Sequence, residues 1–236
     1  TAGFVVAAVG CATAFMAADR ARNDTSAPVV IATGTTARLG PHASLYQPSF
    51  TAPLTAACTA WLEDKPVHLV DGRSSLPITL DVEEPLTVGA DRIVNTLAAS
   101  RLYQRDAIVV DLGTATTFDC ITGDGVFLGG VIAPGVLMMA ESLSRKTSKL
   151  PATELQLPKH IIGRRTEGCI RAGVMYGAAE QIDGLVRRIK ADWPRKKKPV
   201  VIATGGLSEV FKPLCAELEQ VDPHLTGHRA DRRALR

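Results

Sequence analysis

The chain has 236 residues, of which 46% are hydrophobic and 22% are charged, and its formal net charge is +3. This composition is that of a globular protein and excludes disorder throughout, and the length permits one large domain or two small ones. The small excess of positive charge predicts no nucleic-acid partner, because polyanion binding normally requires a clustered basic face.

The five cysteines favour reduced thiols in a cytoplasmic protein, since they are odd in number and widely spaced. No C-x-x-C or Cys/His pairing suggests a metal. Residues 2–18 carry no charge, which raises the alternative of a signal peptide or membrane span. That segment is short, rich in Ala and Gly, and has no basic residue before it. We therefore expect a buried strand and helix start, and no membrane partner.

The spacing of apolar residues and the positions of glycine and proline predict the elements of the first half of the chain. Residues 53–62 have helical spacing, residues 67–70 predict a short buried strand, and residues 76–80 are expected to be extended. A helix then begins at residues 89–92 and runs to about Gln104. Its expected apolar face consists of Ile93, Leu97, Ala98 and Leu102.

The second half begins with a strand at residues 107–111, whose last residue is an acid at the entry to a Gly/Thr turn. Residues 118–122 and 126–128 predict two further strands, joined by the hairpin turn of residues 123–125. Residues 129–135 are expected to lead into a helix that ends near Leu143.

A long helix is predicted from about Thr166 to Lys190. Its expected buried stripe consists of Ile170, Val174, Ala178, Ile182, Val186 and Ile189. The basic run at 195–198 predicts a solvated turn rather than a binding patch. A strand at 200–203, a turn at 204–206 and a helix through about Leu218 complete the pattern. Hairpins followed by helices predict an α/β fold with a mixed sheet.

Residues 111–119 place a carboxylate, a glycine and three threonines at the junction of two strands. The backbone N–H groups and hydroxyls of such a turn can donate to phosphate oxygens, beside a carboxylate that can hold a cation. The alternative is a plain hairpin whose threonines are present because they favour strands.

Two more glycine-rich segments lie at element boundaries, at 204–206 and at 129–135. Residues 204–206 could let the backbone approach a phosphate or an adenosine closely, or could form a plain turn. Residues 129–135 suggest a chain that bends sharply past a ligand, or a strand that leads into a helix. With acids at Asp91, Asp111 and Asp119, the set resembles the divided nucleotide site of the sugar-kinase, hsp70 and actin superfamily. A P-loop is not available, because the chain has no G-x-x-x-x-G-K-[ST].

Three motifs make the resemblance specific: G-A-D-R-I-V-N at 89–95, V-D-L-G-T-A-T-T-F-D at 110–119 and G-G-V-I-A-P-G at 129–135. In order and spacing they resemble type III pantothenate kinase. Shorter matches occur at 163–166, 203–207 and 221–226, so the likeness runs from about Thr51 to Thr226.

The resemblance implies roles for individual residues. Asp91 would be the general base. The pantothenate site would be formed by Gly89, Ala90, Asp91, Arg92 and Thr166. ATP would be bound by Gly113, Thr114, Gly205 and Gly206, and Asp111 would hold K⁺ or NH₄⁺.

These residue types suit the implied chemistry. A primary alcohol is a poor nucleophile near neutral pH, so a carboxylate that accepts its proton assists attack on the γ-phosphate. The planar fork of Arg92 suits a carboxylate or a phosphate. The alternative for Asp91 and Arg92 is a first-turn acid followed by a surface arginine, and Thr166 could instead be a helix N-cap.

The resemblance also implies two ribonuclease-H-like domains with mixed sheets, which we assign to residues 1–104 and 105–236. The implied reaction is phosphorylation of pantothenate by ATP with Mg²⁺, the first step of coenzyme A synthesis. The implied protein is a cytoplasmic homodimer.

The sequence departs from the family pattern at both ends. The expected D-x-G-N-T phosphate loop is missing, residues 1–47 are atypical, and residues 227–236 do not continue a C-terminal helix. We expect a truncated or frame-shifted reading rather than a divergent member, so the N-terminal domain is expected to be incomplete. The alternative functions are a non-catalytic regulator or binding protein, and a kinase of the same superfamily that acts on another alcohol.

Overall fold

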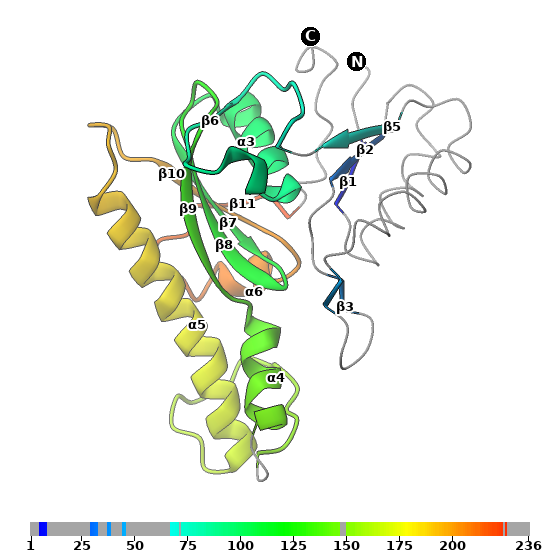
Figure 1. Ribbon diagram of the computed structural model, residues 1–236. Helices are drawn as coiled ribbons and strands as arrows, with labels where there is room; N and C mark the ends of the chain where they lie inside the picture. The colour runs from blue at the N-terminus through cyan, green and yellow to red at the C-terminus, as the bar shows by residue number, and fades with distance from the viewer. Residues whose placement is uncertain are drawn as a thin grey trace. The chain divides into compact units, whose positions relative to one another are not determined.

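The computed structural model in Figure 1 describes residues 5–8, 29–32, 37–38, 44–45, 67–70, 72–146, 150–223 and 225. The chain divides into two compact units. Unit 1 comprises Thr1–Arg105, Ile121–Gly129 and His224–Arg236, and unit 2 comprises Asp106–Cys120 and Gly130–Pro223. The predicted helix at 53–62 and the tail at 227–236 lie outside the described residues. Within the described segments, no helix is long and apolar enough to cross a membrane.

Unit 1 contains a small parallel sheet in the order β1-β2-β5. Its strands are β1 (Val5–Ala8), β2 (Val29–Ala32) and β5 (Val67–Val70), which confirms the strand predicted at 67–70. A separate antiparallel pair joins β3 (Ala37–Arg38) to β4 (Ser44–Leu45).

A six-stranded sheet follows the order β11-β10-β7-β8-β9-β6. Its strands are β6 (Thr79–Leu80), β7 (Ala107–Leu112), β8 (Ala115–Ile121), β9 (Val126–Pro134), β10 (Val200–Thr204) and β11 (Gln220–Val221). β10 pairs in parallel with both β7 and β11. β7 and β8 are antiparallel, since only a two-residue turn joins them. The sheet is therefore mixed, and the α/β prediction is confirmed.

Two strands of this sheet are longer than predicted. β8 begins at Ala115 rather than at 118, because Thr116 and Thr117 continue the extended backbone that β-branched residues favour. β9 continues through Gly129, whose φ is +98°, to Pro134. Helix α4 (Val136–Lys146) therefore starts directly after the strand, so the interpretation of residues 129–135 as a strand leading into a helix is correct.

Helix α3 (Ala90–Tyr103) packs its first turns into the core of unit 1. The core cluster consists of Val70, Ala90, Ile93 and Val94, with Leu76, Ile78, Leu80 and Val88 packed against it. The prediction that Leu102 belongs to the buried face is wrong, because its side chain is 52% exposed. Leu102 lies in the last turn, just before Gln104 ends the helix in the left-handed conformation.

Helix α5 (Thr166–Ala191) runs beside α4 in Figure 1, and its predicted stripe is buried except for the half-buried Ile189. After β10, helix α6 (Ser208–Phe211) is much shorter than the predicted helix through Leu218. Pro213 has no N–H to donate to the carbonyl of Glu209, so the helical hydrogen bonds are interrupted there, although the N–H of Cys215 still donates to the carbonyl of Phe211 at 3.1 Å.

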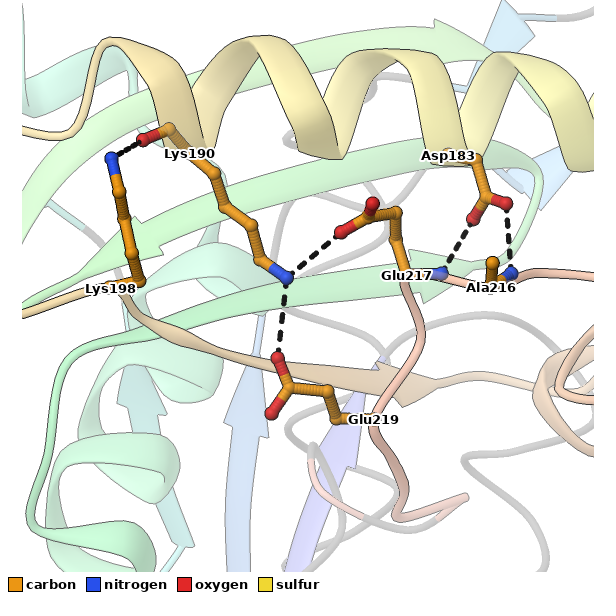
Figure 2. Close-up of polar contacts among 6 residues, drawn as sticks. All are labelled: Asp183, Lys190, Lys198, Ala216, Glu217 and Glu219. Carbon is orange, nitrogen blue, oxygen red and sulfur yellow. Dashed lines mark hydrogen bonds and ion pairs between the residues drawn. The ribbon is translucent and has the colours of Figure 1, made fainter.

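Polar groups of α5 hold the segment that leads into β11, as Figure 2 shows. The buried Asp183 carboxylate accepts hydrogen bonds from the backbone N–H groups of Ala216 at 2.8 Å and Glu217 at 3.0 Å. Lys190 Nζ donates to Glu217 Oε2 at 2.9 Å and to Glu219 Oε1 at 3.3 Å. Lys198 Nζ donates to the carbonyl oxygen of Lys190. These contacts stabilise the edge of the sheet.

Replacing Lys190 by Met should lower the free energy of unfolding by about 1 kcal/mol at pH 7, a small effect because the ion pairs are partly solvated. Burial lowers the pKa of the Lys190 ammonium, but hydrogen bonds and attraction from Glu217 and Glu219 outweigh it, so the net pKa is above 10.5. The native state therefore holds the proton of Lys190 more tightly than the unfolded state does. The stabilisation is complete below pH 10.5 and is lost as the pH rises through the folded pKa. Urea unfolding at pH 7 and pH 11 measures it, with the exposed Lys196→Met as the control.

Candidate functional site

The N-terminus of α3 carries the residues predicted to bind pantothenate. Gly89 precedes the helix with φ −60° and ψ 140°, and Ala90 is buried at its first position. Asp91 lies in the first turn, where the helix dipole favours a negative charge. Asp91 Oδ1 accepts a hydrogen bond from the backbone N–H of Arg92 at 2.9 Å. The carboxylate is thus held over the start of the helix.

Gly89 is needed for that arrangement because its missing side chain leaves room for the carboxylate. A Cβ at Gly89 would lie 2.5 Å from Asp91 Oδ1, well inside van der Waals contact. The same Cβ would lie 4.0 Å from Cγ of Arg92. The glycine thus allows Asp91 to fold back against the chain that enters α3.

The Arg92 guanidinium lies against an aromatic ring of the same unit. Its Cζ is 5.0 Å from the centroid of Phe127 in β9, a cation–π distance. The Phe127 side chain is 1% exposed, and Leu80 of β6 is its partner in the parallel register. Arg92 is therefore not the plain surface arginine of the alternative interpretation.

A second group of predicted residues lies in unit 2, where β7 and β10 end. The parallel register pairs Asp111 with Thr204, so the two carboxyl ends meet at one edge of the sheet. Gly113 and Thr114 form the exposed turn after β7, and Gly205 and Gly206 follow β10. The carboxyl ends of parallel strands are where open α/β sheets bind ligands.

Gly205 brings the two strand ends into contact. Its φ is +87°, a left-handed value that disfavours residues with a side chain. A Cβ there would lie 2.6 Å from Asp111 Oδ1 and 2.8 Å from the carbonyl oxygen of Leu112. Ser208 supports the turn by donating its hydroxyl to the Gly205 carbonyl at 2.7 Å. Asp111 and Leu112 therefore place two oxygens beside Gly205.

Gly135 packs against the turn after β7. A Cβ at this buried glycine would overlap the carbonyl oxygen of Thr114 and would lie 2.6 Å from that of Gly113. The turn is also closed by the Gly113 N–H, which donates to the Ala115 carbonyl at 3.1 Å. That N–H is therefore used within the turn, and Gly113 offers space rather than a donor to a ligand.

The three threonines of the Gly/Thr segment do not act together. Thr114 is exposed in the turn, whereas Thr116 and Thr117 are buried within β8 at 2% and 8% exposure. For these two, the plain strand interpretation is correct. Thr166 is exposed at the first position of α5, and the N-cap is Arg165, so the proposed N-cap role of Thr166 is wrong.

The edge of unit 2 presents oxygen atoms beside open backbone. It combines the Asp111 carboxylate and backbone carbonyls with the exposed Thr114 and a glycine cradle that a single Cβ would fill. Hard cations prefer such oxygen ligands. Among the described residues, no group of three His, Cys, Asp or Glu side chains could hold a metal ion.

Two contacts of this site were not predicted from the sequence, namely those of Phe127 and of Gly135. The Pro134-Gly135 pair after a strand signals a sharp bend, but not which carbonyl groups the glycine contacts. Phe127 is one of six phenylalanines, and nothing in the pattern distinguishes it.

Comparison with known proteins gives consistent results. The family profile for type III pantothenate kinase matches residues 42–188. A type III pantothenate kinase of Syntrophus aciditrophicus is 44% identical over 174 residues, which are 73% of this chain and 67% of that protein. A type III pantothenate kinase of Moorella thermoacetica is 43% identical over 180 residues, which are 76% of this chain and 69% of that protein.

A solved structure supports the fold. A Campylobacter jejuni protein, described as a conserved Baf family transcriptional activator, aligns with a TM-score of 0.52 and 18% identity, covering 88% of this chain and 82% of its own. Such low identity supports the fold alone. The profile and the two relatives support more, and together they show that this chain belongs to the type III pantothenate kinase family.

Proposed function

We propose that this chain phosphorylates the primary alcohol of pantothenate with ATP, giving 4′-phosphopantothenate, in the first step of coenzyme A synthesis. The observation that carries the proposal is the meeting of Asp111 and Leu112 with Gly205 at the carboxyl ends of β7 and β10. Family membership supplies the substrate. In the same proposal, the chain belongs to the actin/hexokinase-like fold with two ribonuclease-H-like domains, divided near residue 104.

The edge of unit 2 would bind the nucleotide. The exposed Thr114 hydroxyl can donate to a phosphate oxygen, and Gly113, Gly205 and Gly206 let the phosphates approach the backbone. Asp111, with the Leu112 carbonyl beside it, would hold K⁺ or NH₄⁺. Mg²⁺ bound with ATP would supply positive charge that neutralises the charge developing on the phosphates.

The start of α3 would bind the alcohol substrate. Asp91 would accept the hydroxyl proton as the oxygen attacks the γ-phosphorus. Arg92 would bind the pantothenate carboxylate, since a guanidinium fork matches two carboxylate oxygens. Gly89 and Ala90 would line this site, and Thr166 would contribute a hydroxyl. A cytoplasmic homodimer is the part of the proposal that rests on the family resemblance alone.

The direct test is whether the purified chain consumes ATP only when pantothenate is added, with Mg²⁺ and K⁺ present. We expect pantothenate-dependent formation of ADP and of a phosphorylated pantothenate, detected by mass spectrometry. ATP consumption that is indifferent to pantothenate would contradict the proposal. If another alcohol is phosphorylated instead, the chain is a different kinase of the same superfamily.

A non-catalytic regulator or binding protein is the second candidate, and turnover separates it from the kinase. Binding of pantothenate with no turnover at millimolar ATP would favour this candidate over the kinase.

Exchanging K⁺ for Na⁺ at constant ionic strength should lower the rate about tenfold or more. Na⁺ is smaller than K⁺, so oxygen ligands spaced for K⁺ would bind it weakly. The positive charge beside Asp111 would then be lost. The measurement is the initial rate against the concentration of each cation. Equal rates in the two salts would remove the cation site from Asp111.

A further inference from the structure

We infer that Phe127 is a positioning residue for Arg92, and that it thereby sets the preference of this site for a substrate that carries a carboxylate. The inference rests on the proposed function, because it takes the start of α3 as the substrate site. It goes further by assigning a role to a residue of β9 that none of the predicted site motifs includes.

Arg92 contacts the Phe127 ring through its guanidinium group. The guanidinium carbon of Arg92 lies 5.0 Å from the centroid of the Phe127 ring, within the range in which the ring attracts a cation. Such a contact uses the face of the guanidinium. The N–H donors point outward in the plane of the group, so the contact does not use them. A stacked arginine can therefore be fixed in direction and still donate to a carboxylate.

The Phe127 ring is held within the core. Phe127 is 1% exposed, and its carbonyl oxygen accepts a hydrogen bond from the backbone N–H of Asp81 at 2.9 Å. Its β9 segment pairs with β6 in parallel register, Leu80 facing Phe127. The ring therefore belongs to the core and cannot turn freely, whereas a long arginine side chain otherwise samples many rotamers.

The two charged groups of the motif make separate contacts. Asp91 Oδ1 is held by the backbone N–H of Arg92 at 2.9 Å, so the carboxylate is tied to the helix start. The Arg92 guanidinium is tied to Phe127 instead. The two opposite charges are therefore held by different groups, although they belong to neighbouring residues. This arrangement suits a substrate whose proton is accepted by Asp91 and whose carboxylate is bound by Arg92.

The experiment compares binding of pantothenate with binding of its neutral alcohol analogue, in which the carboxylate is replaced by CH₂OH, by isothermal titration calorimetry. Phe127→Leu should raise the Kd for pantothenate about tenfold and leave the Kd for the neutral analogue within about twofold. Phe127→Tyr, which keeps the ring, should restore the preference. In an Arg92→Lys background, Phe127→Leu should have little further effect on the ratio of the two constants, because ammonium lacks the planar fork.

Phe118→Leu is the matched control, since Phe118 is a fully buried ring of β8 with no cation–π contact among the described residues. It should leave the ratio unchanged even if it lowers the melting temperature. Should Phe127→Leu fail to fold, Phe127→Met keeps more of the volume and also removes the ring.

The possible results separate the two proposals. Equal weakening of both ligands by Phe127→Leu would make Phe127 an ordinary core residue and overturn the inference, while the kinase proposal stands. If Phe127→Leu raises the KM for ATP and leaves the Kd for pantothenate unchanged, Arg92 binds phosphate instead of the carboxylate. That result would also overturn the inference. If the unmodified chain binds no pantothenate, the proposed function fails, and the inference fails with it.

Discussion

Replacing Asp91 by Asn is expected to lower turnover about 10²- to 10⁴-fold, the usual contribution of a positioned general base. Asn keeps a carbonyl oxygen that can still accept from the Arg92 N–H, the contact that Asp91 Oδ1 makes at 2.9 Å. It cannot accept the proton of the alcohol near neutral pH. The local structure should therefore survive while the chemistry is lost, and initial rates of ADP formation measure the change.

Pantothenate binding distinguishes the loss of turnover in Asp91→Asn from damage to the fold. Stabilisation of Asp91→Asn against heat by pantothenate should remain close to that of the unmodified chain. Asp81→Asn is the matched control, since Asp81 is an exposed acid of the same unit and its replacement should leave the rate unchanged. Full activity of Asp91→Asn would exclude the base role of Asp91.

The second large effect is expected at Gly205. Replacing it by Ala forces a side chain onto a residue with φ +87° and sets a Cβ 2.6 Å from Asp111 Oδ1. The strained backbone and the overlap should together lower the free energy of unfolding by about 2–3 kcal/mol. For a chain of this size, the melting temperature should fall by about 5–10 °C. The displaced Asp111 should also weaken ATP binding about tenfold or more.

Gly206→Ala is the control that this turn provides. Nothing lies within 4 Å of the position that its Cβ would take, and the residue is exposed. Its melting temperature should stay within about 1 °C of the unmodified chain, because exposed substitutions without new contacts change stability little. Equal destabilisation by the two variants would show that the Asp111 contact is not the cause, and unchanged ATP affinity in Gly205→Ala would remove this edge from the nucleotide site.

Much of the fold could be predicted because the relevant signals are local. The apolar runs of β7 and β10 are buried on both faces, as such runs are in central parallel strands. The stripe of α5 repeats at helical spacing and is buried as predicted from Ile170 to Val186. The errors lie at element ends: Leu102 is exposed, α6 is short, and β9 extends to Pro134. Capping and prolines decide such ends, and apolar spacing describes them poorly.

The Asp111 motif illustrates the same division within the site. Its acid and glycine are at a strand end as predicted, because a buried strand followed by Asp-Leu-Gly-Thr has one natural place to turn. Two of its three threonines instead serve the core of β8. A hydroxyl donor and a strand-forming residue are the same residue type, so only burial separates the two roles.

The sequence alone determined the family resemblance, the α/β class and the residues that could do the chemistry, because motif order, apolar period and glycine spacing are properties of the chain itself. The tertiary structure decided which of these residues meet. Asp111 faces Gly205 only because β7 and β10, some ninety residues apart, pair in parallel register. Arg92 meets Phe127 only because β9 packs in the same unit as α3. Contacts between distant segments depend on sheet order and register, which local patterns do not encode.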